Sequence, residues 1–413
     1  MLKRITGSDY AFSVITKLFS VLSGIIYSIL FSRYLGVELR GTASIINNYA
    51  DLISIVLCLG VFQAYPYYKK KKGEDIYERF VNNIYAIILL FGTAIICVVI
   101  LCPLKLSLIV ALLISPVWMG NRQLNYVILV EKPRISNIGC LLLDLIDLIA
   151  VALLMLFTSA DIRWCVFLVV IKQIVFFVIC NINVYHRDFS FRPSLKGIWP
   201  YIRFGIVPMF TFILMEVNYK TDILMLGWYH VDYSDIGIYS LGVMIAQNVW
   251  LIPDALKDIL LSKLVGGKGV EEVSRISRLS FFFTLVCELL LVIFGKPIIR
   301  IMFGKEYENA YGIILIVCGG VLAMVFYKMI YSYNVTEGAK NVNLFLLGMS
   351  ALLNIILNAV TIPSYGVYGA AIASLISYVV CGAGFLLYFC RKTKTKVSDV
   401  VIARRDDIIA LKK

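Results

Sequence analysis

The chain has 413 residues, of which 60% are hydrophobic and 16% are charged, and its mean hydropathy is +0.86. Soluble domains are about 45–50% apolar and about 25% charged, so this composition excludes the soluble enzyme classes and indicates a chain that lies mostly in lipid. The net charge of +13 predicts no nucleic-acid partner, because the basic residues gather in short loops between apolar segments.

Apolar segments long enough to cross a membrane follow one another along the whole chain. A transmembrane helix needs about 20 predominantly apolar residues. By this criterion, the sequence predicts twelve spans, at 11–32, 42–67, 81–101, 106–130, 137–158, 162–184, 204–228, 236–262, 279–295, 311–335, 342–362 and 367–390. We therefore expect an all-α integral membrane protein with about 12 transmembrane helices.

The last two spans come from one long apolar stretch. The range 341–390 contains no charged residue and is too long for a single crossing. Pro363, Gly366 and Gly369 lie near its middle, and both residue types favour turns. The stretch is therefore predicted to form two helices joined by a tight turn.

A long basic loop, Tyr185 to Tyr201, separates six predicted spans from the following six. An even number of spans in each half implies two parallel halves around a central cavity. We expect a domain order of an N-terminal six-helix bundle at 1–190, a cytoplasmic linker at 191–203, a C-terminal six-helix bundle at 204–390 and a basic cytoplasmic tail at 391–413.

The distribution of Lys and Arg predicts the orientation. With the N-terminus in the cytoplasm, the great majority of the basic residues outside the spans fall on the cytoplasmic side, as the positive-inside rule requires. Both termini are therefore expected in the cytoplasm. The first residues lack a small-residue cleavage site, so we expect no removable signal peptide.

Motifs for catalysis and metal binding are not found. The ten cysteines lie in or beside apolar stretches without a CxxC pair, and the two histidines form no HExxH. Neither a GxSxG motif nor a Walker loop occurs. We therefore expect no enzyme activity, no metal site and no cofactor.

Ionisable and polar residues inside the spans are the candidate functional residues. An ionisable group is costly in hydrocarbon, so such groups are expected to face a wet cavity or one another. The candidates are Lys17, Asn47, Asp51, Trp118, Arg122, Asn125, Glu216, Lys220, Asn248, Asp254 and Lys257.

Some of these residues also have a structural interpretation. Glu216 and Lys220 are four residues apart and could form an ion pair along one helix. Lys17 and Lys257 could extend to the membrane surface. Asp254 follows Pro253 and could belong to a kinked region. A third set, Asp144, Asp147 and Lys172, is predicted to form an ion-pair cluster between the fifth and sixth spans.

Several sequence motifs resemble those of a known family. The segment SRYLGVELRG at 32–41 resembles the turn after the first span of Wzx-type polysaccharide repeat-unit flippases, in the superfamily of the MATE exporters and the lipid II flippase. Further similar motifs are DILMLG at 222–227, IGIYS at 236–240, FGKEY at 303–307 and the segment 353–374. The glycines, proline and small residues of the turns and close helix contacts are expected to determine the fold rather than to bind substrate.

The resemblance implies a flippase that moves polyprenyl-pyrophosphate-linked oligosaccharides across the bacterial cytoplasmic membrane by alternating access, for surface polysaccharide assembly. It implies three roles for the candidates. Cations for the pyrophosphate are Lys17, Arg122, Lys220 and Lys257; sugar contacts are Asn47, Trp118, Asn125 and Asn248; acids for coupling to H⁺ or Na⁺ are Asp51, Glu216 and Asp254. Expected partners are the lipid-linked oligosaccharide, membrane lipids, a polysaccharide polymerase and other assembly proteins.

Two alternatives remain open. A MATE-type multidrug antiporter would share the fold, although an acidic cavity is expected there rather than one that mixes acids with Lys and Arg. The second alternative is a scaffold that gathers glycan-assembly enzymes and transports nothing; the basic tail could serve as its binding segment. A simpler interpretation is that the tail is only a solvated basic segment beside the last span. The absence of two extra helices and of several cavity arginines counts against lipid II as the substrate.

Overall fold

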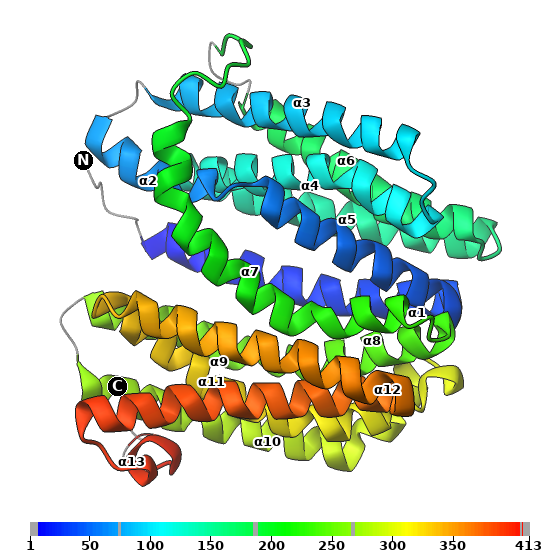
Figure 1. Cartoon of the computed structure of the whole chain (residues 1–413). Coiled ribbons are helices and arrows are strands. Elements are labelled where there is room, and N and C mark those ends of the chain that lie inside the picture. The colour runs from blue at the N-terminus through cyan, green and yellow to red at the C-terminus, as the bar shows by residue number, and fades with distance from the viewer. Residues whose placement is uncertain (1–6, 73–75, 185–188, 266–268, 405–406, 408–413) are drawn as a thin grey trace. The chain divides into compact units, whose positions relative to one another are not determined.

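The structure is a computed structural model, and it describes residues 7–72, 76–184, 189–265, 269–404 and 407. These residues form helices and no strand (Figure 1). The helices are α1 (Gly7–Leu57), α2 (Val61–Lys72), α3 (Tyr77–Leu101), α4 (Leu106–Glu131), α5 (Pro133–Phe157), α6 (Ile162–Val184), α7 (Trp199–Trp228), α8 (Tyr233–Asn248), α9 (Leu251–Val265), α10 (Val270–Met302), α11 (Ala310–Thr336), α12 (Lys340–Thr393) and α13 (Val397–Val401), with a short 3₁₀ helix at Lys305–Tyr307.

Helix α1 contains a break that divides it into two arms. Gly36 has φ 69° and ψ −178°, a conformation that side chains with a Cβ rarely adopt. The Arg40 guanidinium donates a hydrogen bond to the Ser32 hydroxyl across this break. The turn predicted in the motif at 32–41 is therefore confirmed.

Helix α12 is a hairpin, as predicted from its length and from the residues at its middle. Gly366 has φ 54°, and the Thr361 hydroxyl donates to the Gly369 carbonyl across the turn, at 2.9 Å. The two arms also bond to each other, since Asn354 Nδ2 lies 3.1 Å from Ser377 Oγ. Figure 1 shows the arms side by side, gold and then red.

Eight of the described helices are long and apolar enough to cross a membrane: α1, α3, α5, α6, α7, α10, α11 and α12. The bent pair of α8 and α9 makes a ninth. Helix α4 fails this test because polar residues around Arg122 interrupt it. When α1 and α12 are each counted as two arms, and α4 is added, these helices correspond to the twelve predicted ranges, except that the predicted span 42–67 is interrupted after Leu57 and resumes as α2 at Val61. The protein is thus an all-α, multi-pass membrane protein, as predicted.

The chain divides into two compact units, residues 1–213 and 214–413, and the division falls inside α7. In unit 1, helix α4 packs against α1, α2, α3, α5 and α6. In unit 2, helix α11 packs against α8, α9, α10 and α12. Both central helices occupy the fourth predicted span of their half, so the order of helices around each core is similar.

Candidate functional site: charged clusters within the membrane-spanning helices

The charged residues of unit 1 include a pair that joins α1 to α4. The Arg122 guanidinium donates a hydrogen bond to Asp51 Oδ1, and both side chains are largely buried. The guanidinium also lies over the Phe212 ring, 5.3 Å from the centroid. Because the ring supports the cation and the carboxylate neutralises it, this pair satisfies a charge that would otherwise be costly in hydrocarbon. The sequence identified both charged residues, but not their pairing.

A second pair in unit 1 confirms a prediction. Lys172 Nζ of α6 lies 2.7 Å from Asp147 Oδ2 of α5, and the same amine lies 5.3 Å from the centroid of the Tyr27 ring. The Asp147 side chain is only 5% exposed, whereas Lys172 is 38% exposed. This contact holds neighbouring helices of the same unit together, as expected for an ion-pair cluster.

Glu216 and Lys220 of α7 form the predicted pair along one helix. Lys220 Nζ lies 2.6 Å from Glu216 Oε2, and the side chains are 21% and 14% exposed, respectively. Each charge therefore has a partner in the same helix, one turn away. Their predicted roles in binding and coupling remain predictions.

Asp254 is shared between two lysines from different helices. Lys328 Nζ of α11 lies 2.9 and 3.0 Å from the two Asp254 carboxylate oxygens, and Lys257 Nζ of α9 lies 3.2 Å from Oδ1. One carboxylate thus faces two ammonium groups, which leaves this group of three, the Asp254 cluster, with a net positive charge. Asp254 and Lys257 are 41% and 36% exposed, whereas Lys328 is 11% exposed.

An aromatic cluster lies on one side of Lys328. The Trp250 ring centroid lies 4.5 Å from Lys328 Nζ, and the indole N–H donates to the Val321 carbonyl at 2.9 Å. The rings of Tyr219 and Tyr378 pack against Trp250, with centroids 5.2 and 6.0 Å away. The Tyr219 hydroxyl is buried and has no hydrogen-bond partner within the described residues. A polar atom in such a place is costly unless it finds a partner.

Local backbone geometry places Asp254 and Trp250 at a bend. Helices α8 and α9 meet at an angle of 42° across Val249 and Trp250. Pro253 explains the position of this bend, because proline has no N–H and its ring clashes with the carbonyl of the residue four positions earlier, here Val249. The kink expected near Pro253 is therefore confirmed.

The other predicted residues take part in none of these four groups through any contact in the described structure. Asn125 accepts a hydrogen bond from Ser136 at 2.8 Å, and Trp118 packs against the apolar core of α1, α4, α5 and α6. Asn47 is half-buried on α1. Asn248 is exposed at the end of α8. Lys17 belongs to α1, but its side chain lies outside the described part of the chain.

Sequence analysis did not single out Lys328, Trp250 or Glu288 as site residues. Lys328 is the only charged residue in its apolar span, and Glu288 is the only one in the span at 279–295. A single charge in an apolar span is the sequence feature that could have identified each of them. In the structure, Glu288 of α10 is 5% exposed, and its Oε1 has no hydrogen-bond partner among the described residues. A buried acid of this kind is a functional candidate by default.

No family model matches this chain. A segment of 128 residues, 30% of the chain, is 28% identical to an uncharacterized membrane protein of Methanocaldococcus jannaschii. That segment spans 24% of the archaeal protein, so the chain matches about a quarter of its length.

Solved structures show similarity over nearly the whole chain. The lipid II flippase MurJ in an inward closed conformation has a TM-score of 0.76, with 18% identity over 94% of this chain and 88% of that chain. An inward-facing multidrug resistance MATE transporter of the MOP superfamily has a TM-score of 0.64, with 12% identity over 91% of this chain and 96% of that chain.

A third structure is a MOP-superfamily transporter from Pyrococcus furiosus, described by the reversed polarity of its binding pocket. It has a TM-score of 0.54, with 12% identity over 93% of this chain and 94% of that chain. These neighbours are a flippase and transporters, not enzymes. The chain therefore has the fold of the MOP-superfamily membrane transporters.

Proposed function

We propose that this chain is a transporter that moves polyprenyl-pyrophosphate-linked oligosaccharide repeat units across the bacterial cytoplasmic membrane by alternating access. The observation that carries the proposal is the Asp254 cluster, in which one carboxylate faces two ammonium groups beside a tryptophan. Excess positive charge in a low-dielectric region favours an anionic ligand. The fold similarity to a lipid II flippase supports a lipid-linked substrate.

The Asp254 cluster offers what a sugar pyrophosphate requires. Lys328 and Lys257 can donate hydrogen bonds to phosphate oxygens, since each ammonium carries three donors and neither is saturated by one carboxylate. Trp250 presents a flat apolar ring beside them, and the Tyr219 hydroxyl can bond to a ligand without breaking an existing hydrogen bond. A pyrophosphate would therefore gain direct contacts and would relieve the repulsion between the two lysines.

The remaining candidates keep the roles inferred from the resemblance. We assign Lys17, Arg122 and Lys220 to the path of the pyrophosphate and Asn47, Trp118, Asn125 and Asn248 to the sugars. Asp51, Glu216 and Asp254 are the acids for H⁺ or Na⁺ coupling. In this proposal, the two six-helix halves enclose the substrate in a central cavity, with both termini in the cytoplasm, and the exported units serve a polysaccharide polymerase.

A reconstituted transport assay tests this proposal. The purified full chain is placed in lipid vesicles with a fluorescent polyprenyl-pyrophosphate-linked sugar, and an impermeant quencher reports the fraction on the outer leaflet. We expect the wild-type protein to equilibrate the probe between leaflets. Lys328→Gln and Lys257→Gln should slow equilibration at least tenfold, because each removes one phosphate-binding ammonium.

The matched control is Lys296→Gln. Lys296 is 59% exposed and pairs with Glu308 at 3.1 Å at the far end of α10, so its loss removes the same charge elsewhere. Equal rates for the wild type, Lys328→Gln and Lys257→Gln would contradict a role of the Asp254 cluster. If even the wild-type protein leaves the probe on its original leaflet, the flippase assignment itself is wrong.

A cation-coupled multidrug antiporter is the second candidate. The neighbouring MATE structures and the buried acid Glu288, whose Oε1 has no hydrogen-bond partner among the described residues, favour it. Drug resistance in cells that express the chain, lost in Glu288→Gln, would support this function. Unchanged drug sensitivity together with active flipping would exclude it.

A further inference from the structure

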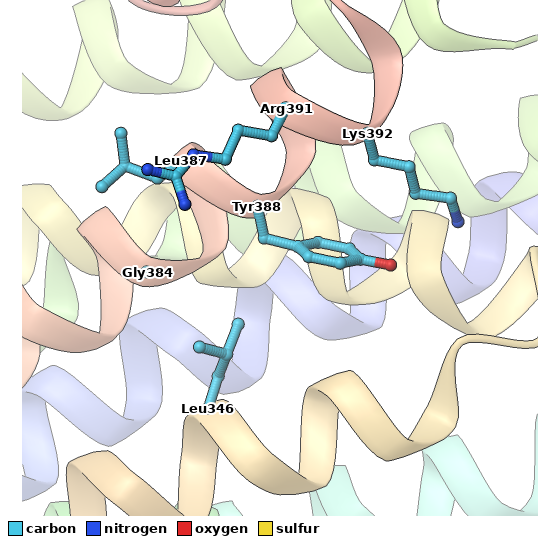
Figure 2. Close-up of a pocket in the computed structure, with 6 residues that line it drawn as sticks. All are labelled: Leu346, Gly384, Leu387, Tyr388, Arg391 and Lys392. Atoms are coloured by element: carbon cyan, nitrogen blue, oxygen red, sulfur yellow. The ribbon is translucent and has the colours of Figure 1, made fainter.

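A pocket lies between the two arms of α12 in unit 2, apart from the Asp254 cluster. Its volume is about 520 Å³, within the range of small-molecule sites, roughly 300 to 1,000 Å³. Leu346 of the first arm and Gly384 and Leu387 of the second arm form apolar walls. Figure 2 shows Leu346 at one end of the pocket and the side chains of Arg391 and Lys392 at the other.

The charged end of this pocket coincides with the end of the apolar sequence. No charged residue occurs in the range 341–390, and Arg391 and Lys392 are the first charges after it. They therefore lie where an apolar helix leaves the hydrocarbon and reaches the polar membrane surface. The pocket thus presents an apolar wall and a pair of cations in the order in which a lipid presents its chain and its headgroup.

Both cations are exposed, and no ion pair within the described part of the chain includes either of them. Lys392 Nζ lies 5.4 Å from the centroid of the Tyr333 ring and 5.9 Å from that of Tyr388. These rings contact the ammonium group without neutralising its charge. An anion can therefore bind Arg391 and Lys392 without first breaking an ion pair.

We propose that this pocket binds one anionic phospholipid of the surrounding leaflet. The headgroup phosphate bonds to Arg391 and Lys392, and one acyl chain lies against Leu346 and Leu387. Leu387 is 49% exposed, so the chain covers apolar surface that already faces lipid. Basic pockets between membrane helices bind anionic headgroups by this charge complementarity. The lining residues of this pocket include none of those assigned above to transport, and the proposal does not depend on that assignment.

Native mass spectrometry of the purified full chain tests the proposal. Phosphatidylglycerol and phosphatidylcholine with identical acyl chains are added in turn, and the lipid-bound fraction is measured. We expect phosphatidylglycerol to be retained at least fivefold better than phosphatidylcholine. The double variant Arg391→Gln/Lys392→Gln should lose this preference.

A second double variant, Lys394→Asn/Lys396→Gln, removes the same charge from residues outside the pocket. Asn is used at position 394 because Lys394 has a positive φ of 57°, which Asn tolerates. The control should retain the lipid like the wild type. If both double variants lose phosphatidylglycerol retention equally, the tail attracts lipid only through its overall positive charge, and the proposed site is wrong.

Two further experiments test the pocket itself. Gly384→Leu fills it without a change of charge, because an added Cβ at Gly384 already comes within 3.1 Å of Leu346 Cδ2. A correctly folded, monodisperse Gly384→Leu protein should retain less phosphatidylglycerol, and full retention would contradict the proposal. A polyprenyl phosphate that displaces phosphatidylglycerol at equal concentration would assign the pocket to the transported substrate and would also overturn it.

Discussion

The Ser374 hydroxyl donates a hydrogen bond to Asp222 Oδ2 at 3.1 Å, although 152 residues separate them in the chain. Tyr239 donates to the same oxygen, and the backbone N–H of Ile223 lies 2.8 Å from Oδ1. Asp222, Tyr239 and Ser374 come from three of the motifs that carry the family resemblance. These motifs therefore meet in one buried network that joins α7, α8 and α12, which indicates a role in folding.

Asp222→Ala should lower the stability of unit 2 by about 2 to 4 kcal/mol, because it leaves two buried hydroxyl donors unpaired. Ser374→Ala should cost less, about 0.6 kcal/mol, a typical value for one hydrogen bond in a membrane protein. Thermal unfolding of the detergent-solubilised chain, followed by fluorescence size exclusion, measures both. Ser240→Ala is the control, since the bond of that hydroxyl among the described residues stays within its own helix, at Gly237 O.

Gly382→Ala should destabilise the contact between α11 and α12 by about 1 to 3 kcal/mol. An added Cβ would lie 2.0 Å from the Ala323 carbonyl oxygen, so the helices would have to separate. A Cβ added at Gly92 in α3 would meet no atom within 4 Å, so Gly92→Ala should be neutral or stabilising by up to about 1 kcal/mol. Parallel melting curves of the two variants check this difference, and equal losses of stability would refute the close approach.

The pair of Asp51 and Arg122 should behave as a coupled unit. Arg122→Gln and Asp51→Asn each leave one largely buried charge unpaired, and each should destabilise the protein. The double variant should be more stable than the sum of the two effects predicts, by about 1 to 3 kcal/mol. A double-mutant cycle of unfolding free energies measures this coupling.

The same double variant separates structure from transport. If Arg122 contacts the substrate, as proposed, vesicle flipping stays slow in the double variant although its stability recovers. Flipping at the wild-type rate would restrict Arg122 to its structural pair with Asp51 and its contact with Phe212.

Acidification should release the C-terminal segment from α10. Burial alone would raise the pKa of Asp407, but hydrogen bonds from Arg278 and from the Arg404 backbone N–H outweigh it and lower this pKa. A lowered pKa stabilises the docked segment at all pH values above the unfolded pKa, about 3.9 for Asp. This stabilisation is lost as the pH falls from that value through the pKa of the docked state.

Limited proteolysis between pH 6 and pH 3 measures this release. Cleavage of the C-terminal segment of the wild-type chain should accelerate below about pH 4, the ordinary range of an aspartate. Asp407→Asn cannot titrate and should be cleaved faster at pH 6, with little further change on acidification. An identical pH profile for the two proteins would show that another group controls release.

The sequence predicted those features that depend on neighbouring residues. The breaks at Gly36 and Gly366 were predictable because a turn leaves a local signal in glycine and proline. The pair of Glu216 and Lys220 was predictable because one helical turn separates them. The bend at Trp250 followed from Pro253 in the same way.

The tertiary ion pairs were not predictable by the same reasoning. Asp51 and Arg122 lie 71 residues apart, and Asp254 and Lys328 lie 74 residues apart, so their contacts depend on how whole helices pack. Sequence analysis therefore found most of the charged residues of the candidate site, but it missed Lys328 and could not tell which charges neutralise each other. The excess charge at Asp254, which distinguishes that cluster from the others, became visible only with Lys328 in place.

The spacing of the Asp222 network also bears on how the chain is made. At roughly 5 to 20 residues per second, a ribosome reaches Ser374 some 8 to 30 s after Asp222. Tyr239 is only 17 residues away and follows within a few seconds. Asp222 can therefore enter the bilayer already shielded by its neighbour in α8, and the hydroxyl of α12 completes the network when the last hairpin inserts.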